Sequence, residues 1–372
     1  MLVINEEQQM LKTSAKELLK ERGTVAHLRK LRDEQSPIGY DPDLWALIAE
    51  MGWTALTIPE AYGGFDYGYT GLGQVMEEMG RNLTASPLFS TVWLSATAIN
   101  KSQNSAHKQA LLPAIASGDM VIAFAFEEGR HHQPLQIATS AKKQGDGYIL
   151  HGTKTMVLDG HIAEKFIVTA MVNDEIAFFV VDAQKAGVTA NRTIMMDSRN
   201  AATIHFENVS LTMDARLDIP GKGAELLEQT LDIARIGLAA EMLGGCLEAF
   251  ERTVAYLKER EQFGVPIGSF QALQHRAALM FCEIELCKSI VIKALKGIDS
   301  DASDLTKLAS LAKAKLGETY QLVSNEGIQM FGGIGMTDDE EIGFFLKRAR
   351  VAQQTLGDTN FHLDRLAKIN GY

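Results

Sequence analysis

The hydrophobic repeat changes its period twice along the chain, and no other sequence feature constrains the fold as strongly. From about residue 5 to about residue 118, apolar residues recur every three or four positions, which predicts helices. From about residue 119 to about residue 212, short runs rich in β-branched and aromatic residues predict strands. Long helical repeats return after Gly221 and continue almost to the end. This order predicts an α+β fold with a helical domain over 1–118, a β domain over 119–215 and a helical bundle over 216–372.

Charge and composition exclude several classes of function. The chain has 372 residues and a net charge of -11, which disfavours nucleic acid and anionic membranes as partners. Three cysteines without metal-ligand spacing argue against a disulfide framework. The sequence has no run of ~20 apolar residues and its N-terminus is too polar for a signal peptide. We therefore expect a cytoplasmic protein rather than a secreted or membrane protein.

Two conspicuous motifs do not by themselves indicate a binding site. The glycine-rich string GGIGMTDDEEIG follows a helical pattern rather than a strand, so it does not fit a dinucleotide-binding β-α turn. His131 and His132 stand together in a polar stretch with no third ligand at a recognisable spacing. We expect a solvated loop there and no metal site.

The segment EREQFGVPIGSFQALQHRAALM, residues 259–280, is the strongest local signal. One long helix is expected to end near Arg260, and another to start near Ser269 after a turn through Phe263 and Pro266. This places an arginine, aromatic rings and glutamines together at a helix junction, which suits an anionic ligand. A plain helical hairpin with a salt-bridged arginine is the alternative that composition alone leaves open.

This segment, with QMFGGIGMTDDEEIGFFLKRARV, PEAYGG, YILHGTK and the helix–sheet–helix order, resembles the acyl-CoA dehydrogenase family over essentially the whole chain. The resemblance implies an N-terminal helical domain, a middle β-barrel or β-sandwich and a C-terminal four-helix bundle. It also implies FAD as cofactor, an acyl-CoA substrate, and electron-transfer flavoprotein or a similar acceptor as partner. The assembly it implies is a homotetramer or an α2β2 heterotetramer.

Carried over by position, the resemblance assigns residues to the cofactor and the substrate. Met156 and Leu158 stand where many members have an aromatic residue and a hydroxyl beside the flavin, so this chain departs from the pattern there. Arg235 is assigned to the substrate. The residues assigned to FAD are Arg260, Gln262, Phe263, Phe270, Gln271, Gln329, Gly332, Gly333, Phe126 and Met156.

The base that removes the substrate's α-proton is the main departure. The two positions where the family carries its glutamate are Gly357 and Ala234 in this chain. Glu241 lies seven residues after Ala234, close to two full helical turns, so it is expected on the same face and is our leading candidate. A buried glutamate paired with an arginine is an equally good interpretation. Asp358 is the runner-up, although a capping or turn role is favoured for it.

Two functions are consistent with these features. The first is FAD-dependent α,β-dehydrogenation of a bulky or unusual acyl-CoA, with Glu241 as base. The second is a non-catalytic partner subunit of a heteromeric acyl-CoA dehydrogenase that has lost its own base. An oxidase or monooxygenase of the same fold is a more distant interpretation.

Overall fold

The computed structural model describes residues 3–372, which fall into two compact units. The first unit contains the residues up to Glu34, Tyr69–Thr84 and Arg235–Tyr372; the second contains Gln35–Gly68 and Ala85–Ala234. Three of the boundaries between the units lie in turns or irregular segments, and the fourth, between Ala234 and Arg235, lies within one long helix. The domain bounds expected at residues 118 and 215 stay predictions, because this grouping distributes the N-terminal helices over both units.

The second unit is built on a seven-stranded sheet, and all seven runs predicted as strands form it. Its order is β1-β4-β2-β3-β7-β6, with β5 paired antiparallel to β4. The long β3–β7 pair carries two register shifts, one of them between Lys154 and Val157. The strands are β1 (Ile122–Ala125), β2 (Ser140–Gln144), β3 (Gly147–Leu158), β4 (Lys165–Val172), β5 (Glu175–Asp182), β6 (Val188–Ile194) and β7 (Asn200–Thr212).

Helices of the same unit pack beside this sheet. An eight-residue π-helix, η2 (Phe89–Ala96), is fully buried and lies against β1, and the helical period of the sequence did not distinguish it from an α-helix. The π-helix is rare and is frequent at functional sites. The other helices are α3 (Pro42–Glu50), η1 (Glu60–Tyr62), α5 (Thr97–Lys101), α6 (Ser105–Ala116) and η3 (Met213–Ala215).

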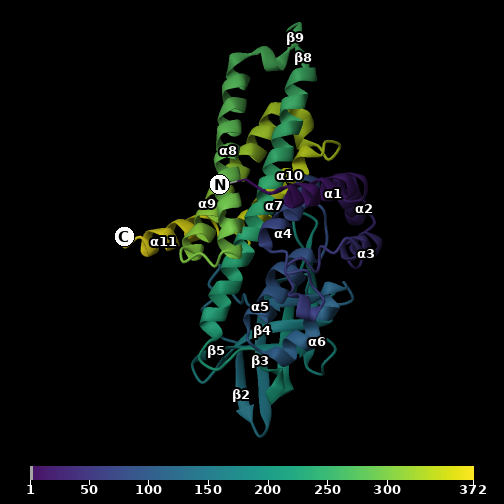
Figure 1. Ribbon diagram of the computed structural model, residues 1–372. Helices are drawn as coiled ribbons and strands as arrows, with labels where there is room; N and C mark the ends of the chain where they lie inside the picture. The colour runs from purple at the N-terminus through teal and green to yellow at the C-terminus, as the bar shows by residue number, and fades with distance from the viewer. Residues whose placement is uncertain (1–2) are drawn as a thin grey trace. The chain divides into compact units, whose positions relative to one another are not determined.

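The first unit is helical. Its longest helices are joined at one end by a small hairpin, which Figure 1 shows between α7 and α8. Helix α7 (Gly223–Glu259) begins in the other unit and continues without a break. The remaining elements are α1 (Glu6–Arg22), α2 (Val25–Asp33), α4 (Tyr69–Asn82), β8 (Glu261–Gln262), β9 (Val265–Pro266), η4 (Ile267–Ser269), α8 (Gln271–Asp299), α9 (Leu305–Phe331), η5 (Gly332–Met336), α10 (Ile342–Gln354) and α11 (Thr359–Ile369).

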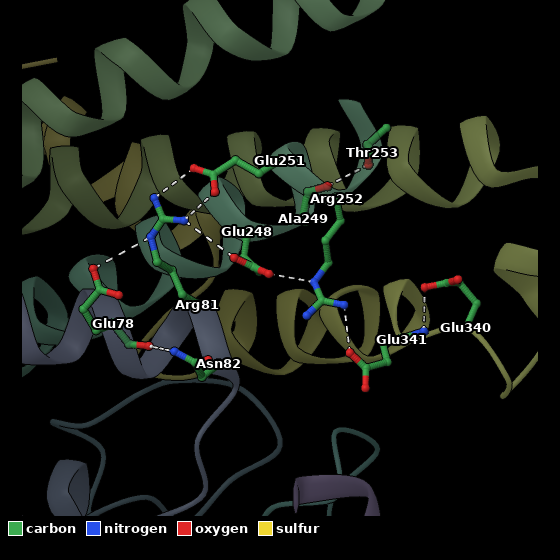
Figure 2. A network of polar contacts seen from close by, with 10 residues as sticks. All are labelled: Glu78, Arg81, Asn82, Glu248, Ala249, Glu251, Arg252, Thr253, Glu340 and Glu341. Atoms are coloured by element: carbon green, nitrogen blue, oxygen red, sulfur yellow. Dashed lines mark hydrogen bonds and ion pairs between the residues drawn. The ribbon is translucent and has the colours of Figure 1, made fainter. Parts of the chain in front are cut away.

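A network of ion pairs joins three segments of this unit (Figure 2). Arg81 of α4 donates to both oxygens of Glu251 on α7, each at 3.0 Å, and lies 3.6 Å from Glu248. Arg252 bonds Glu248 and Glu341, each at 2.8 Å, and so extends the network to the start of α10. Isolated surface pairs contribute little to stability, but a connected network fixes the relative orientation of α4, α7 and α10.

Candidate active site

The predicted helix junction is a tight hairpin that exposes two aromatic rings. Phe263 and Gly264 both have left-handed backbone angles, φ 58° and 78°, as a two-residue hairpin loop requires. The rings of Phe263 and Phe270 meet edge to face with centroids 6.1 Å apart, although Phe263 is 91% exposed and Phe270 40% exposed. Solvent-exposed apolar pairs of this kind mark binding surfaces.

Arg260 lies at the root of this hairpin. It follows the last residue of α7, and its backbone N–H donates to Tyr256. Its side chain is exposed and forms no ion pair with the part of the chain that the structure describes. The plain-hairpin alternative requires a salt bridge from Arg260 to a carboxylate, and the described residues form none. Gln262 and Gln271 are also exposed beside it.

The glycine segment after α9 lies in open space. Gly332 has φ 67°, and a Cβ added at Gly332 or Gly333 would meet no atom within 4 Å. The ring of Phe331 stacks on Tyr256 of α7 at 4.2 Å, and the Tyr256 hydroxyl donates to the Phe331 carbonyl at 3.3 Å. This contact ties the end of α9, with Gln329, to the helix that leads into Arg260. The structure thus brings the two predicted cofactor segments of this unit onto neighbouring helices.

Two arginines that the sequence did not single out hold the segment after these glycines. Arg32 of α2 bonds both carboxylate oxygens of Asp338, at 2.7 and 2.6 Å, and Arg29 lies 2.8 Å from the same group. The hydrogen bonds from Arg32 lower the pKa of Asp338 to about 2. The contact is not visible in the sequence because α2 and Asp338 are about 300 residues apart.

The second unit carries the other two predicted FAD contacts, Phe126 and Met156. Phe126 is buried just after β1, whereas Met156 is exposed, with φ 51°, at the register shift of β3. The N–H of Thr155 donates to the Glu127 carbonyl at 2.8 Å, so the two segments that carry Phe126 and Met156 lie side by side. Bulges of this type often re-aim a side chain next to an active site.

Lys154, a buried lysine of β3, holds the segment of Phe126 beside the segment of Met156. Lys154 is fully buried and donates to the Phe126 carbonyl, to Glu128 at 2.7 Å and to Thr169 at 3.0 Å. Burial lowers the pKa of Lys154 to about 8, against the opposing effect of Glu128. Burial alone disfavours the charge of Glu128, but Lys154 and the hydrogen bonds to its carboxylate outweigh that effect and lower its pKa.

The expected solvated histidine loop is only half correct. His131 is exposed, but the side chain of His132 is 6% exposed and its Nδ1 contacts the carboxylate of Glu127. The His132 ring also meets Phe126 edge to face at 6.2 Å. The sequence did not predict this contact between His132 and Glu127. The flanking residues are polar, and residues five apart match neither the helical nor the strand period. Within residues 3–372, no group of three or more His, Cys, Asp or Glu side chains could hold a metal ion.

Glu241, the leading candidate for the base, is locked in an ion pair. The Nε and one terminal nitrogen of Arg348 donate to its two oxygens at 3.0 and 2.9 Å. The side chains of Glu241 and Arg348 are 3% and 8% exposed. Both oxygens are therefore engaged with a buried cation, which supports the buried-ion-pair interpretation of this glutamate over a proton-abstracting one.

Asp358 is the N-cap of α11, as the turn interpretation expected. Its Oδ1 accepts from the Phe361 N–H at 2.8 Å, whereas Oδ2 accepts no hydrogen bond from the described residues. The preceding turn is strained at Leu356, which has φ 61°, whereas Gly357 adopts φ 102° without strain. A glutamate would be unfavourable at position 357 with this backbone.

Buried polar side chains surround this turn. Arg235, assigned to the substrate, is fully buried, and its Nε donates to the Leu356 carbonyl at 3.2 Å. His362 contacts the same carbonyl at 3.1 Å. Lys313 donates to the carbonyls of Gln353 and Gly357. Sequence reasoning missed Lys313 and His362, because each lies on an ordinary amphipathic helix and only the fold directs them to one turn. The substrate role of Arg235 stays a prediction.

The exposed features of the hairpin and glycine segment fit a dinucleotide with an anionic centre. Arg260 offers an uncompensated guanidinium for a pyrophosphate, and the exposed rings of Phe263 and Phe270 offer apolar surface for an adenine. Gly332 and Gly333 leave room for a close backbone approach. A helix–sheet–helix chain with such a site belongs to the flavoprotein class of acyl-CoA oxidoreductases in its architecture.

Comparison with known proteins identifies the family. Models of the acyl-CoA dehydrogenase N-terminal, middle and C-terminal domains match residues 5–119, 125–209 and 221–370. The chain is 30% identical to the mitochondrial isovaleryl-CoA dehydrogenase of Arabidopsis thaliana, over 86% of this chain and 80% of that protein. It is 27% identical to an acyl-CoA dehydrogenase of Mycolicibacterium smegmatis, over 98% of both chains.

Solved structures agree. A chain of a variant of the Tcur3481–Tcur3483 steroid ACAD is 32% identical, with a TM-score of 0.89 and 98% of each chain covered. This chain belongs to the acyl-CoA dehydrogenase family. No helix of residues 3–372 is long and apolar enough to cross a membrane.

Proposed function

We propose that this chain carries out FAD-dependent α,β-dehydrogenation of an acyl-CoA thioester. The observation that carries the proposal is the hairpin at the end of α7, where an uncompensated arginine lies beside two exposed aromatic rings and the chain keeps the family's sequence around them. The exposed rings would gain free energy when a ligand covers them, and the guanidinium is available to an anionic group. Family membership, established over nearly the whole chain, supports the same assignment.

The cofactor, when bound, supplies the acceptor for the hydride that leaves the substrate's β-carbon. The protein's own part is to hold the thioester and to take the proton from the α-carbon. Arg260, Phe263, Phe270 and the glycine segment would bind FAD in the first unit. Phe126 and Met156 of the second unit stay predicted flavin contacts.

The availability of a carboxylate oxygen favours Asp358 over Glu241 as the candidate base. A general base must have a free basic atom within hydrogen-bond reach of the proton that it removes. Both oxygens of Glu241 are held by Arg348, whereas Oδ2 of Asp358 has no hydrogen bond from the described chain. We therefore propose Asp358, rather than Glu241, as the base.

An anaerobic titration tests the proposed activity directly. The FAD-loaded protein is mixed with a panel of straight-chain, branched, cyclic and steroid-derived acyl-CoA thioesters, and flavin absorbance is followed. Bleaching by at least one thioester, with formation of the α,β-unsaturated product, is the expected result. A flavin that no member of the panel bleaches would contradict the proposed activity for the isolated chain.

Substitution of Arg260 tests the cofactor site independently of turnover. Loss of a hydrogen bond to a charged group costs about 1.5–3 kcal/mol, so Arg260→Ala should weaken FAD binding roughly 10- to 100-fold. Binding is measured by flavin fluorescence with the apoprotein. Lys258→Ala removes a nearby charge from the same helix and serves as the control. Equal FAD affinity in wild type and Arg260→Ala would show that the guanidinium does not bind the cofactor.

A non-catalytic role beside a second, active chain is the alternative function. The ion pair of Glu241 and the capping role of Asp358 favour it, because neither residue would then need to be a base. The similar steroid ACAD chain comes from a protein whose name gives two components, Tcur3481 and Tcur3483, and this is consistent with an α2β2 assembly. Bleaching that requires co-expression with such a partner would support this alternative, whereas bleaching by a homotetramer of this chain would exclude it. Electron-transfer flavoprotein remains the expected acceptor in either case.

A further inference from the structure

Lys313 is a buried lysine that no proposed step of the reaction uses. It lies on α9, is 1% exposed, and donates from Nζ to the Gly357 carbonyl at 2.9 Å and the Gln353 carbonyl at 3.0 Å. Within residues 3–372 no carboxylate forms an ion pair with it. A buried lysine without an ion-pair partner is expensive, so its retention at this position requires a reason.

The turn that Lys313 binds is strained. Leu356 adopts a left-handed backbone conformation, which costs a residue other than glycine about 1–3 kcal/mol and persists only where the surroundings enforce it. The carbonyls of Gln353 and Gly357 bracket Leu356, and Lys313 bridges them. The amine therefore closes the turn from both sides, one residue before Asp358.

Charged groups from three further elements surround the amine. Burial lowers the pKa of Lys313 to about 7; Arg235 of α7 and Arg348 of α10 also lower it, and Asp358 at the start of α11 opposes them. His362 faces the same turn from α11, and Glu241 neutralises Arg348.

We propose that Lys313 is a positioning residue for the Asp358 carboxylate. Its two hydrogen bonds to the carbonyls of Gln353 and Gly357 hold the turn that presents Asp358. The neutral amine keeps two N–H groups, so both carbonyl bonds survive deprotonation. This inference rests on the proposed role of Asp358 as base and adds a residue that acts through it.

The pH dependence of folding tests the titration of Lys313 without any substrate. The amine binds its proton less readily in the folded protein, about 7, than in the unfolded chain, about 10.4. The unfolded state therefore holds more protons between these values, and the contribution of Lys313 to stability rises with pH across that window. The urea midpoint of the wild type, compared with that of Lys313→Gln, should rise from about pH 7 to about pH 9. A constant difference would overturn the proton linkage.

The rate of flavin reduction tests the positioning role. With the thioester that bleaches the flavin fastest in the panel, Lys313→Gln should reduce its flavin about tenfold more slowly than wild type at saturating thioester, with unchanged FAD content. Lys313→Arg keeps donors for both carbonyls and should retain most of the wild-type rate. Lys307→Gln, a half-buried position on the same helix, is the matched control.

The outcomes separate this inference from the function on which it rests. A purely structural Lys313 would lower the unfolding midpoint of Lys313→Gln but leave the rate of flavin reduction by the folded protein unchanged, and that result overturns the inference. Loss of all bleaching in the wild type, or an unchanged rate in Asp358→Asn, refutes the proposed function instead. If Lys313→Gln does not fold, a Lys313→Arg rate more than about tenfold below the wild-type rate also overturns the inference.

Discussion

Asp358→Asn should slow flavin reduction by roughly 10²- to 10⁴-fold, the range typical of the loss of a general base. Asparagine is as good an N-cap as aspartate, so the hydrogen bond to the Phe361 N–H and the start of α11 should be preserved. The rate is measured by anaerobic stopped-flow bleaching of the FAD-loaded protein. FAD content and thermal midpoint should stay at their wild-type values.

Two controls make this experiment specific. Asp364→Asn changes an exposed aspartate on the same helix, paired only with Lys368, and should leave the rate unchanged. Asp358→Ala removes both the carboxylate and the cap and should add a stability loss of about 1 kcal/mol to the same loss of rate. A normal rate in Asp358→Asn would restore the interpretation of this residue as a cap alone and would favour the non-catalytic subunit.

Glu241→Gln should destabilise the protein by about 3–5 kcal/mol, because it leaves the buried Arg348 without its counter-charge. Loss of the charge also weakens both hydrogen bonds that hold the guanidinium. Chemical and thermal unfolding measure the effect. At a temperature where the variant is folded, its rate of flavin reduction should remain within a few-fold of wild type.

The matched control is Glu251→Gln, which weakens the pair with Arg81 on a side chain that is 56% exposed and should cost less than about 1 kcal/mol. A double variant in which Met replaces both Glu241 and Arg348 should recover much of the lost stability, because no unpaired buried charge remains. If Glu241→Gln instead lost activity at normal stability, Glu241 would be the base after all.

The hydrophobic period alone was enough to predict the layout of the chain. All seven strands fall within the region predicted as strands, because most of them combine β-branched or aromatic residues with turn residues at their ends, as in KFIVTAMV before Asn173. The strand β2, with the sequence SAKKQ, has neither residue type. The helices α7 and α9 were equally clear because their apolar repeats are long. Patterns of this kind are local, so they survive without knowledge of what each face packs against.

Two local features were not predictable from period. The π-helix Phe89–Ala96 has nearly the same apolar spacing as an α-helix, and the difference is a shift in hydrogen-bond partner that side chains do not encode directly. The left-handed Phe263 in the β8–β9 hairpin is similarly hidden, because aromatic residues rarely adopt that conformation and no propensity rule suggests it.

The predicted cofactor residues followed from the motif, whereas the interpretation of the carboxylates depended on contacts over long distances. By itself the sequence determined the helix–sheet–helix order, the family, and the empty positions at Ala234 and Gly357, because each depends on residues close together along the chain. Only the tertiary structure showed that Arg348 forms an ion pair with Glu241, 107 residues away in the sequence, and that Lys313 donates a hydrogen bond to the carbonyl of Gly357, 44 residues away. An ion pair or a buried hydrogen bond is formed by the packing of helices, and helical spacing gives the face of a side chain without its partner.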